Sequence, residues 1–158
     1  MCGIIGSNKY PITRNTLNEL SHRGPNERGI VNHDGVILGH TRLSIIGIED
    51  GQQPARFEKE KVSITFNGEI YNYIELQNTL QKSGYRVNTS SDTEVLLEYY
   101  IAFGIDRLLN DVNGMFAFAI HDERYNTMLL VRDRLGIKPL LYLAEKDGIS
   151  FCSEITPL

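Results

Sequence analysis

Short apolar segments with the period of β-strands recur along the chain, and turn-forming residues separate them. Each segment is rich in β-branched or aromatic side chains, as is typical of strands. The pattern predicts strands at Cys2–Gly6, Val36–Leu43, Val62–Asn67, Met115–His121, Met128–Arg132, Leu140–Leu143 and Ile149–Ser153. Turn signals occur at Asn113-Gly114, Arg124-Tyr125-Asn126 and Lys146-Asp147-Gly148. The last two signals predict hairpins, because each separates two neighbouring strands.

Helical periodicity appears in three further segments, Thr13–Ser21, Tyr73–Ser83 and Asp92–Phe103. The third begins with Ser91-x-x-Glu94, which reads as a capping box, and the second begins with Asn72-x-x-Glu75 and ends before Gly84. Hairpins interspersed with helices, rather than regular strand-helix alternation, favour an α+β fold with antiparallel sheets.

The composition is that of one ordinary globular domain. The chain has 158 residues, of which 41% are hydrophobic, enough for one core. Its 16 basic and 20 acidic side chains give a net charge of 16 − 20 = −4. This charge, without a basic cluster, argues against nucleic acid or an anionic membrane as a partner. Two cysteines make no disulfide framework, and the absence of a secretory leader or a long apolar run leads us to expect a cytoplasmic protein.

Cys2 is the first residue with candidate chemistry. Removal of Met1 would place a thiol and a free α-amine on the same residue. The pKa of an α-amine lies near ~7.7–8.0, which suits a general base at neutral pH. The amine could then activate the thiol without a histidine. On its own, however, a Met-Cys start favours the simpler interpretation of a small buried cysteine in the first strand.

Six motifs in order give Cys2 a context. They are Met1-Cys2-Gly3-Ile4-Ile5-Gly6, His22-Arg23-Gly24-Pro25, Thr41-Arg42-Leu43-Ser44-Ile45, Asn67-Gly68-Glu69-Ile70-Tyr71-Asn72, Ser91-Asp92-Thr93-Glu94 and Arg132-Asp133-Arg134-Leu135-Gly136-Ile137-Lys138-Pro139-Leu140. The set closely resembles the glutaminase domain of class II glutamine amidotransferases, in the version found in glutamine-dependent asparagine synthetases. The resemblance covers essentially the whole chain and implies one glutaminase domain over residues 2–158.

The resemblance implies a fold and a reaction. The fold is the four-layer αββα sandwich of N-terminal-nucleophile hydrolases, with two antiparallel sheets between helical layers. The reaction is hydrolysis of the glutamine side-chain amide through a γ-glutamyl thioester, which releases ammonia for a second active site. Cys2 would be the nucleophile and its α-amine the proton shuttle.

Asn67 and Gly68 correspond to the oxyanion hole of the family, which acyl transfer requires. The side-chain amide of Asn67 and the backbone N–H of Gly68 would be the donors. Without the resemblance, an Asn-Gly turn between strands is the simpler interpretation of these two residues.

The resemblance also assigns residues to substrate binding. A guanidinium can pair with the α-carboxylate of glutamine through two hydrogen bonds, and Arg42 matches that position. Asp92 matches the carboxylate that binds the α-ammonium, with Glu69 as a second acid. The backbone of Leu43, Ser44, Ile45 and Ile46 would complete the pocket wall. From the sequence alone, Asp92 could equally be a helix-start charge and Arg42 a surface residue at a strand end.

The remaining motifs are interpreted as structural. His22 is expected to position a loop, because the α-amine already supplies the base. Arg132-Asp133 and Lys138-Pro139 are expected to form buried polar contacts, and Cys152 to be a core thiol. No cysteine–histidine spacing suggests a metal site. Gly47 stands where many relatives have an acid, which leaves the neighbouring pocket loop less well defined.

The chain carries no Ser-Gly-Gly-x-Asp-Ser loop and no glycine-rich phosphate cradle. We therefore expect no cofactor in this chain, and ATP and Mg²⁺ only on an ATP-pyrophosphatase-type synthetase domain or subunit that uses the ammonia. Glutamine is the expected substrate, and a homodimer is possible. The alternative is a catalytically silent glutamine-binding or regulatory module of a synthetase complex.

Overall fold

Two antiparallel sheets form the framework of the protein in the computed structural model, which describes residues 1–44, 51–87 and 90–158. The sheets have the strand orders β2-β3-β1-β9-β8 and β4-β5-β6-β7. The strands are β1 (Gly3–Ser7), β2 (Glu27–His33), β3 (Val36–Arg42), β4 (Ala55–Phe57), β5 (Val62–Ile70), β6 (Gly114–Asp122), β7 (Thr127–Arg132), β8 (Leu141–Glu145) and β9 (Gly148–Cys152). The helices are α1 (Arg14–Asn18), α2 (Tyr73–Lys82) and α3 (Asp92–Asp111).

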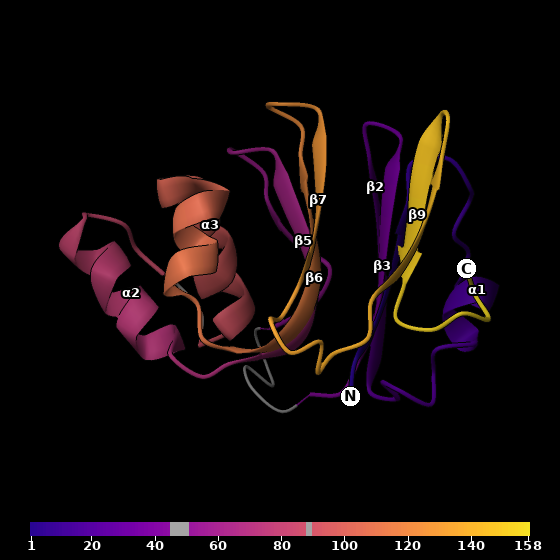
Figure 1. Cartoon of the computed structure of the whole chain (residues 1–158), viewed down its shortest axis with the longest axis horizontal. Helices are drawn as coiled ribbons and strands as arrows, with labels where there is room; N and C mark the ends of the chain where they lie inside the picture. Colours follow the sequence, from indigo (N-terminus) through magenta and orange to yellow (C-terminus); the bar gives the residue numbers. More distant parts are fainter. Residues whose placement is uncertain (45–50, 88–89) are drawn as a thin grey trace.

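The elements are stacked in four layers. Figure 1 shows α2 and α3 on the outer face of the sheet that contains β5, β6 and β7, and α1 on the outer face of the other sheet. The outer layer beside β3 and β9 contains one short helix, whereas the opposite layer contains two longer ones. The predicted αββα order is confirmed, with one helical layer much thinner than the other.

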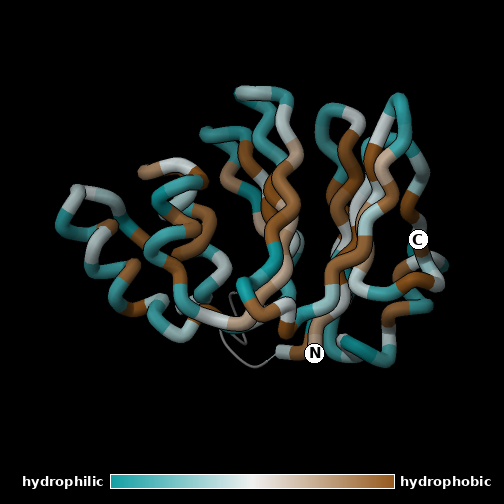
Figure 2. Tube along the Cα trace, in the orientation of Figure 1, coloured by the Kyte–Doolittle hydropathy of each residue, from teal (hydrophilic) through white to brown (hydrophobic). Residues whose placement is uncertain are grey.

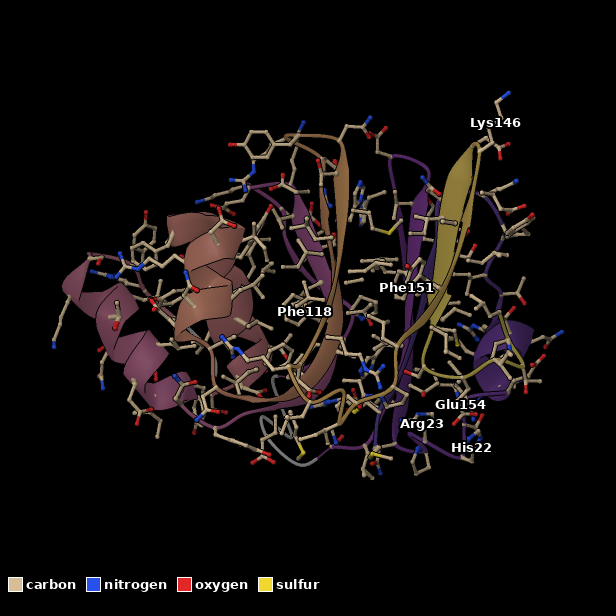
Figure 3. All side chains as sticks on the ribbon, in the orientation of Figure 1. His22, Arg23, Phe118, Lys146, Phe151 and Glu154 are labelled. Atoms are coloured by element: carbon tan, nitrogen blue, oxygen red, sulfur yellow. The ribbon has the colours of Figure 1, made fainter. Side chains whose placement is uncertain are left out.

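The alternation of side chains along β6 explains this stacking. Phe116, Phe118 and Ile120 belong to a core shared with α2 and α3, whereas Ala117 and Ala119 belong to a second core between the sheets. Successive strand residues point to opposite faces, so one strand supplies both cores. Figure 3 labels Phe118 beside α3 and Phe151 between the sheets.

A third, smaller core lies under α1. Ile5 and Cys152, from the five-stranded sheet, pack against Leu17 and Leu20. Figure 2 shows hydrophobic residues along the middle of the strands in both sheets and hydrophilic residues in many of the loops at their ends. Apolar burial on both faces of each sheet therefore supports all four layers.

The predicted strands and both hairpins are present, with bounds shifted by one to three residues. Two strands were not predicted. β2 reads Glu-Arg-Gly-Ile-Val-Asn-His and lies at a sheet edge, where exposed and half-buried residues alternate. β4 has three residues, Ala55–Phe57, too few to show a period.

The helix predictions were correct in place and less accurate in length. α1 is shorter than predicted, and α3 continues to Asp111 across Gly104, whose φ of 80° interrupts the helical geometry where an end was expected. Gly84 follows α2 with a φ of 87°, as a helix-terminating glycine does. No helix among the described residues is long and apolar enough to cross a bilayer.

The two helix starts use their polar residues differently. The side chain of Ser91 accepts a hydrogen bond from the Thr93 N–H, so Ser91 is a true N-cap. Asn72 makes no side-chain cap; its amide donates to the carbonyl of Asp111 and accepts from the N–H of Asn113. Asn72 therefore ties the end of α3 to the start of β6 instead of capping α2.

Candidate functional site

The candidate site lies along one edge of β5. Strand β4 pairs with β5 only from Val62 to Ile64, so Phe66–Ile70 extends beyond the end of β4; we call this segment the open edge of β5. Backbone N–H groups alternate between the two sides of a strand. The N–H groups of Phe66, Gly68 and Ile70 therefore point to the same side, away from β6.

The first and third of these N–H groups have side-chain acceptors. The Phe66 N–H donates to Oε1 of Gln53 at 2.7 Å, and the Ile70 N–H donates to Oδ2 of Asp92 at 3.1 Å. The N–H of Gly68 lies between them and faces the same side. A row of three donors thus has both ends occupied and its middle donor directed towards the site.

A cavity of about 250 Å³ lies beside this edge. Seven residues predicted from the sequence line it: Cys2, Arg42, Leu43, Asn67, Gly68, Glu69 and Asp92. They come from the N-terminus, from the end of β3, from β5 and from the start of α3. Segments far apart in the sequence therefore converge on one cavity, which is slightly smaller than the ~300–1,000 Å³ typical of ligand pockets.

Cys2 lies at the junction between the sheets. Its Sγ accepts a hydrogen bond from the Leu43 N–H at 3.3 Å, and its carbonyl accepts one from Nε of Arg23 at 3.0 Å. Burial raises the pKa of the Cys2 thiol, and the Leu43 N–H, the N-terminal ammonium, Arg42 and Lys138 act in the opposite direction. With Met1 in place, the nitrogen of Cys2 is part of a peptide bond.

The side-chain amide of Asn67 supplies a hydrogen-bond donor that is not bound to another group of the described protein. Its side chain is 1% exposed, and among the described residues Nδ2 has no hydrogen-bond partner. Buried amides are rarely left without a partner, so this donor indicates a place for a ligand acceptor. Asn67 and Gly68 pair with Ala117 and Phe116 of β6 inside the strand, and the simpler interpretation of a hairpin turn is wrong.

Gly68 is required by close packing. A Cβ at this position would lie 2.3 Å from the carbonyl oxygen of Met115. Any side chain would push β5 away from β6 and displace the neighbouring donor of Asn67.

Arg42 is buried, with 4% of its surface exposed, so its interpretation as a surface residue is wrong. Its Nη1 lies 3.0 Å from Oε1 of Glu27, a residue of the unpredicted strand β2. The register pairs Glu27 directly with Arg42. Glu27 therefore orients the guanidinium at the cavity wall.

Asp92 is both the first residue of α3 and part of the cavity wall. Burial raises the pKa of its carboxyl, and the charge of Glu69 adds to this effect. Hydrogen bonds from the N–H groups of Ile70 and Thr93 act in the opposite direction. A buried carboxylate held by backbone donors beside a second acid suits a bound ammonium group.

The predicted backbone wall is only partly described. Leu43 lines the cavity. The N–H of Ser44 donates to Oδ1 of Asn26, and Ser44 does not line the cavity. Ile45, Ile46 and Gly47 lie outside the described residues.

The motif from Arg132 to Leu140 contains a structural residue, Asp133, and a residue that lines the cavity, Lys138. The Asp133 carboxylate accepts four backbone N–H bonds, from Phe116, Leu135, Ile137 and Lys138. These donors lower its pKa against the effect of burial. Lys138 was expected to form only buried polar contacts. It is 6% exposed and lines the cavity with Cys2.

The other candidates stand apart from the cavity. His22 and Arg23 both contact Oε1 of Glu154 at 2.9 Å, and Figure 3 labels the three side chains close together. Cys152 is buried in the core beside α1, where burial raises the pKa of its thiol to about 11. Within the described ranges, no group of three His, Cys, Asp or Glu side chains could bind a metal ion.

Several cavity residues were not predicted from the sequence. They are Gly51, Gln53, Phe66, Thr93, Met115 and Lys138. Of these, Thr93 and Lys138 stand inside quoted motifs, and their neighbours Asp92 and Pro139 could have drawn attention to them. Gln53 lies in no quoted motif and carries no local signal.

Comparison with known proteins agrees with this geometry. A family model for the glutamine amidotransferase domain matches residues 1–158. The chain therefore belongs to the glutamine amidotransferase domain family. It is 42% identical to glutamine-hydrolyzing asparagine synthetase 1 of Bacillus subtilis, over 98% of this chain and 26% of that protein. It is 41% identical to a probable glutamine-hydrolyzing asparagine synthetase of Dictyostelium discoideum, over 86% of this chain and 25% of that protein.

The chain thus spans about a quarter of the length of these curated relatives. Among solved structures, the Bacillus subtilis glutamine phosphoribosylpyrophosphate amidotransferase complexed with ADP and GMP is similar, with a TM-score of 0.77 at 24% identity. The similarity covers 96% of this chain and 42% of that one. The fold is the N-terminal-nucleophile hydrolase sandwich that the sequence predicted.

Proposed function

We propose that residues 2–158 form a glutaminase domain that hydrolyses the side-chain amide of glutamine to glutamate and ammonia. The observation that carries this proposal is one cavity containing the Cys2 thiol and the unpartnered Nδ2 donor of Asn67. Arg42 and Asp92 line the same cavity, with charges opposite to those of the α-carboxylate and α-ammonium of glutamine.

The proposed reaction proceeds through a thioester. The α-amine of Cys2, once freed from Met1, takes the thiol proton, and the sulfur bonds to the amide carbon. The resulting oxyanion accepts hydrogen bonds from Asn67 Nδ2 and the Gly68 N–H. The carbon–nitrogen bond then breaks as the protonated amine gives its proton to the nitrogen, which leaves as ammonia.

Water completes the cycle. It loses a proton to the same amine and attacks the thioester carbon, and the oxyanion is stabilised by the same two donors. Collapse of this intermediate breaks the carbon–sulfur bond and releases glutamate, and the protonated amine returns its proton to the sulfur. One amine thus serves as base and acid in turn, and the described part of the site needs no histidine.

The proposal is tested with matched samples that retain or lack Met1, verified by intact mass. Ammonia release from glutamine is expected only from the processed form, because the peptide nitrogen of Cys2 cannot act as a base. Cys2→Ala should abolish release. Cys152→Ala, which removes the other thiol, should keep it. Equal turnover with and without Met1 would exclude the amine as the base.

The alternative, a silent binding module, gives a different result in the same samples. Calorimetry would then show glutamine binding by the processed protein without ammonia release. Release of ammonia by the wild type and its loss in Cys2→Ala would exclude this alternative.

We further propose that the ammonia serves an ATP-dependent synthetase domain or subunit, which would hold ATP and Mg²⁺. Support comes from the curated relatives, which are named asparagine synthetases and are about four times as long as this chain. A reactive thiol as nucleophile also favours the reducing cytoplasm. The test is co-expression with an ATP-pyrophosphatase-type synthetase, followed by assay with glutamine. Stimulated turnover supports the proposal, and unchanged turnover contradicts it.

A further inference from the structure

The side chain of Gln53 makes a hydrogen bond at each end of its amide. Its Oε1 accepts from the Phe66 N–H at 2.7 Å, and its Nε2 donates to Oγ1 of Thr93 at 3.2 Å. Phe66 directly precedes Asn67, and Thr93 directly follows Asp92. One side chain therefore connects the strand that carries the oxyanion donors to the helix start that carries the ammonium-binding carboxylate.

The backbone of Gln53 is fixed against the other sheet. A Cβ on Gly29 of β2 would lie only 2.1 Å from the Gln53 carbonyl oxygen, so the two backbones are in direct contact. The sheet containing β2 also contains β1, which follows Cys2. Gln53 therefore links three parts of the site: the sheet of the nucleophile, the strand of the donors and the first turn of α3.

Phe66 has a second contact across the sheets. Its carbonyl accepts a hydrogen bond from Nε2 of His40 at 3.0 Å. His40 is fully buried and lies in β3, in the same sheet as β1. Both polar backbone groups of Phe66 are thus bound by side chains that approach from outside its own sheet.

We propose that Gln53 is a positioning residue for glutamine hydrolysis, which sets the place of the Asn67 and Gly68 donors relative to Cys2 and Asp92. This inference rests on the proposed function. The direct bond from Ile70 to Asp92 fixes only the far end of the open edge of β5. Strand β6 holds the other side of this segment, and Gln53 adds a second attachment at Phe66, so the open side is fixed at both of its ends. Misplacement of a reacting group by about 1 Å can cost ~10²-fold in rate.

The key variant is Gln53→Met, which keeps the length of the side chain and removes both hydrogen bonds. We expect kcat for glutamine to fall roughly 10- to 100-fold, less than the ~10²–10³-fold loss caused by removal of an oxyanion donor. KM should change less than about threefold, because the residues assigned to the α-carboxylate and α-ammonium remain. Thermal unfolding confirms that the variant is folded.

Two substitutions of Thr93 provide a matched pair of variants, one that removes the hydroxyl and one that retains it. Thr93→Val removes the Oγ1 acceptor and should lower kcat, whereas Thr93→Ser retains it and should keep the wild-type rate. The double variant Gln53→Met/Thr93→Val should be no slower than Gln53→Met, because both changes break the same link. Independent multiplication of the two losses would contradict a shared role.

Two measurements separate this inference from the proposed function. Hydrogen exchange at the Phe66 amide should accelerate in Gln53→Met whether or not the protein hydrolyses glutamine. A wild type that releases no ammonia would overturn the proposed function and, with it, a role of Gln53 in hydrolysis. An active wild type with an equally active, folded Gln53→Met overturns only the positioning role. A rise in KM alone would also overturn it, by making Gln53 a substrate contact.

Discussion

The backbone N–H of Ile70 donates a hydrogen bond to Oδ2 of Asp92 across 3.1 Å. This bond joins the last residue of β5 to the first residue of α3. The donor that holds the carboxylate at the cavity wall is a backbone N–H, which every residue except proline retains. The place of the carboxylate that we propose to bind the α-ammonium is therefore set by the backbone of the strand that carries the proposed oxyanion donors.

Asp92→Asn should raise the glutamine KM about 30-fold or more. The amide keeps the shape of the side chain but leaves the α-ammonium without its counter-charge, and loss of one partner of a desolvated pair costs about 2–5 kcal/mol. Steady-state kinetics provide the measurement. Asp106→Asn, the same change at an exposed position of α3, is the control and should be silent.

Arg42→Ala should also raise KM strongly, because it removes the cation assigned to the α-carboxylate. It also leaves Glu27 without its partner at 3.0 Å. Glu27→Gln removes only the charge that orients the guanidinium, so its effect on KM should be smaller. A larger effect from Glu27→Gln than from Arg42→Ala would show that the roles of the two residues are misassigned.

Asn67→Ala should lower kcat by ~10²–10³ with little change in KM, as loss of one oxyanion donor does. The donor acts where negative charge develops, so ground-state binding is little affected. The exposed Asn78 of α2 does not line the cavity and offers a control, since Asn78→Ala should leave both constants unchanged. A change confined to KM would place Asn67 in substrate binding instead.

The pH dependence of stability should show the contribution of His40. Burial lowers its pKa to about 4 from an ordinary value of 6.5, so the folded protein disfavours the charged ring. Between these two pH values the unfolded chain binds a proton that the folded protein does not. The neutral His40 therefore does not reduce the free energy of unfolding above pH 6.5. As the pH drops towards 4, the free energy of unfolding falls by up to about 3 kcal/mol.

Urea unfolding from pH 4 to 7 tests the predicted direction of this pH dependence. The pH slope should be shallower in His40→Gln, which keeps a donor near the Phe66 carbonyl without a titrating ring. An unchanged slope would assign the pH dependence to other groups.

Lys138→Met should slow alkylation of Cys2 by iodoacetamide near neutral pH. The charge of Lys138 lowers the pKa of the buried thiol, and its loss should leave less thiolate at a given pH. The pH profile of the alkylation rate should shift upwards. Lys146→Met, on the exposed turn labelled in Figure 3, should not shift it.

Most of the site was predicted from the resemblance that six ordered motifs carry, because residue patterns alone left simpler interpretations open for Cys2, Arg42, Asn67 and Asp92. Asn67 and Gly68 follow a strand pattern, Asp92 follows a helix cap, and Cys2 follows the initiator methionine. Each such residue is recognisable within a short segment. The hairpins and helices visible in the pattern predicted an α+β fold with antiparallel sheets, whereas the four-layer sandwich was implied by the resemblance.

The contacts of Glu27 and Gln53 could not be predicted, because they depend on the edges of the two sheets. Strand β2 lies at the edge of its sheet, and its two large apolar residues, Ile30 and Val31, are adjacent, so its sequence shows no alternation of apolar and polar residues. Glu27 therefore had no visible link to Arg42. Gln53 reaches its partners only because β4 ends before Phe66 and leaves an N–H for it. An unpaired backbone group is a property of the assembled sheet, and no local pattern encodes it.

Strand β1 lies in the middle of its sheet, between β3 and β9, and Ile4 exchanges hydrogen bonds with Ser153. The strand that directly follows Cys2 is therefore held by a residue 149 positions away in the sequence. Its partner strand β9 ends at Cys152, and Glu154 fixes the arginine that binds the Cys2 carbonyl. The position of the proposed nucleophile therefore depends on a segment that lies at the opposite end of the described sequence.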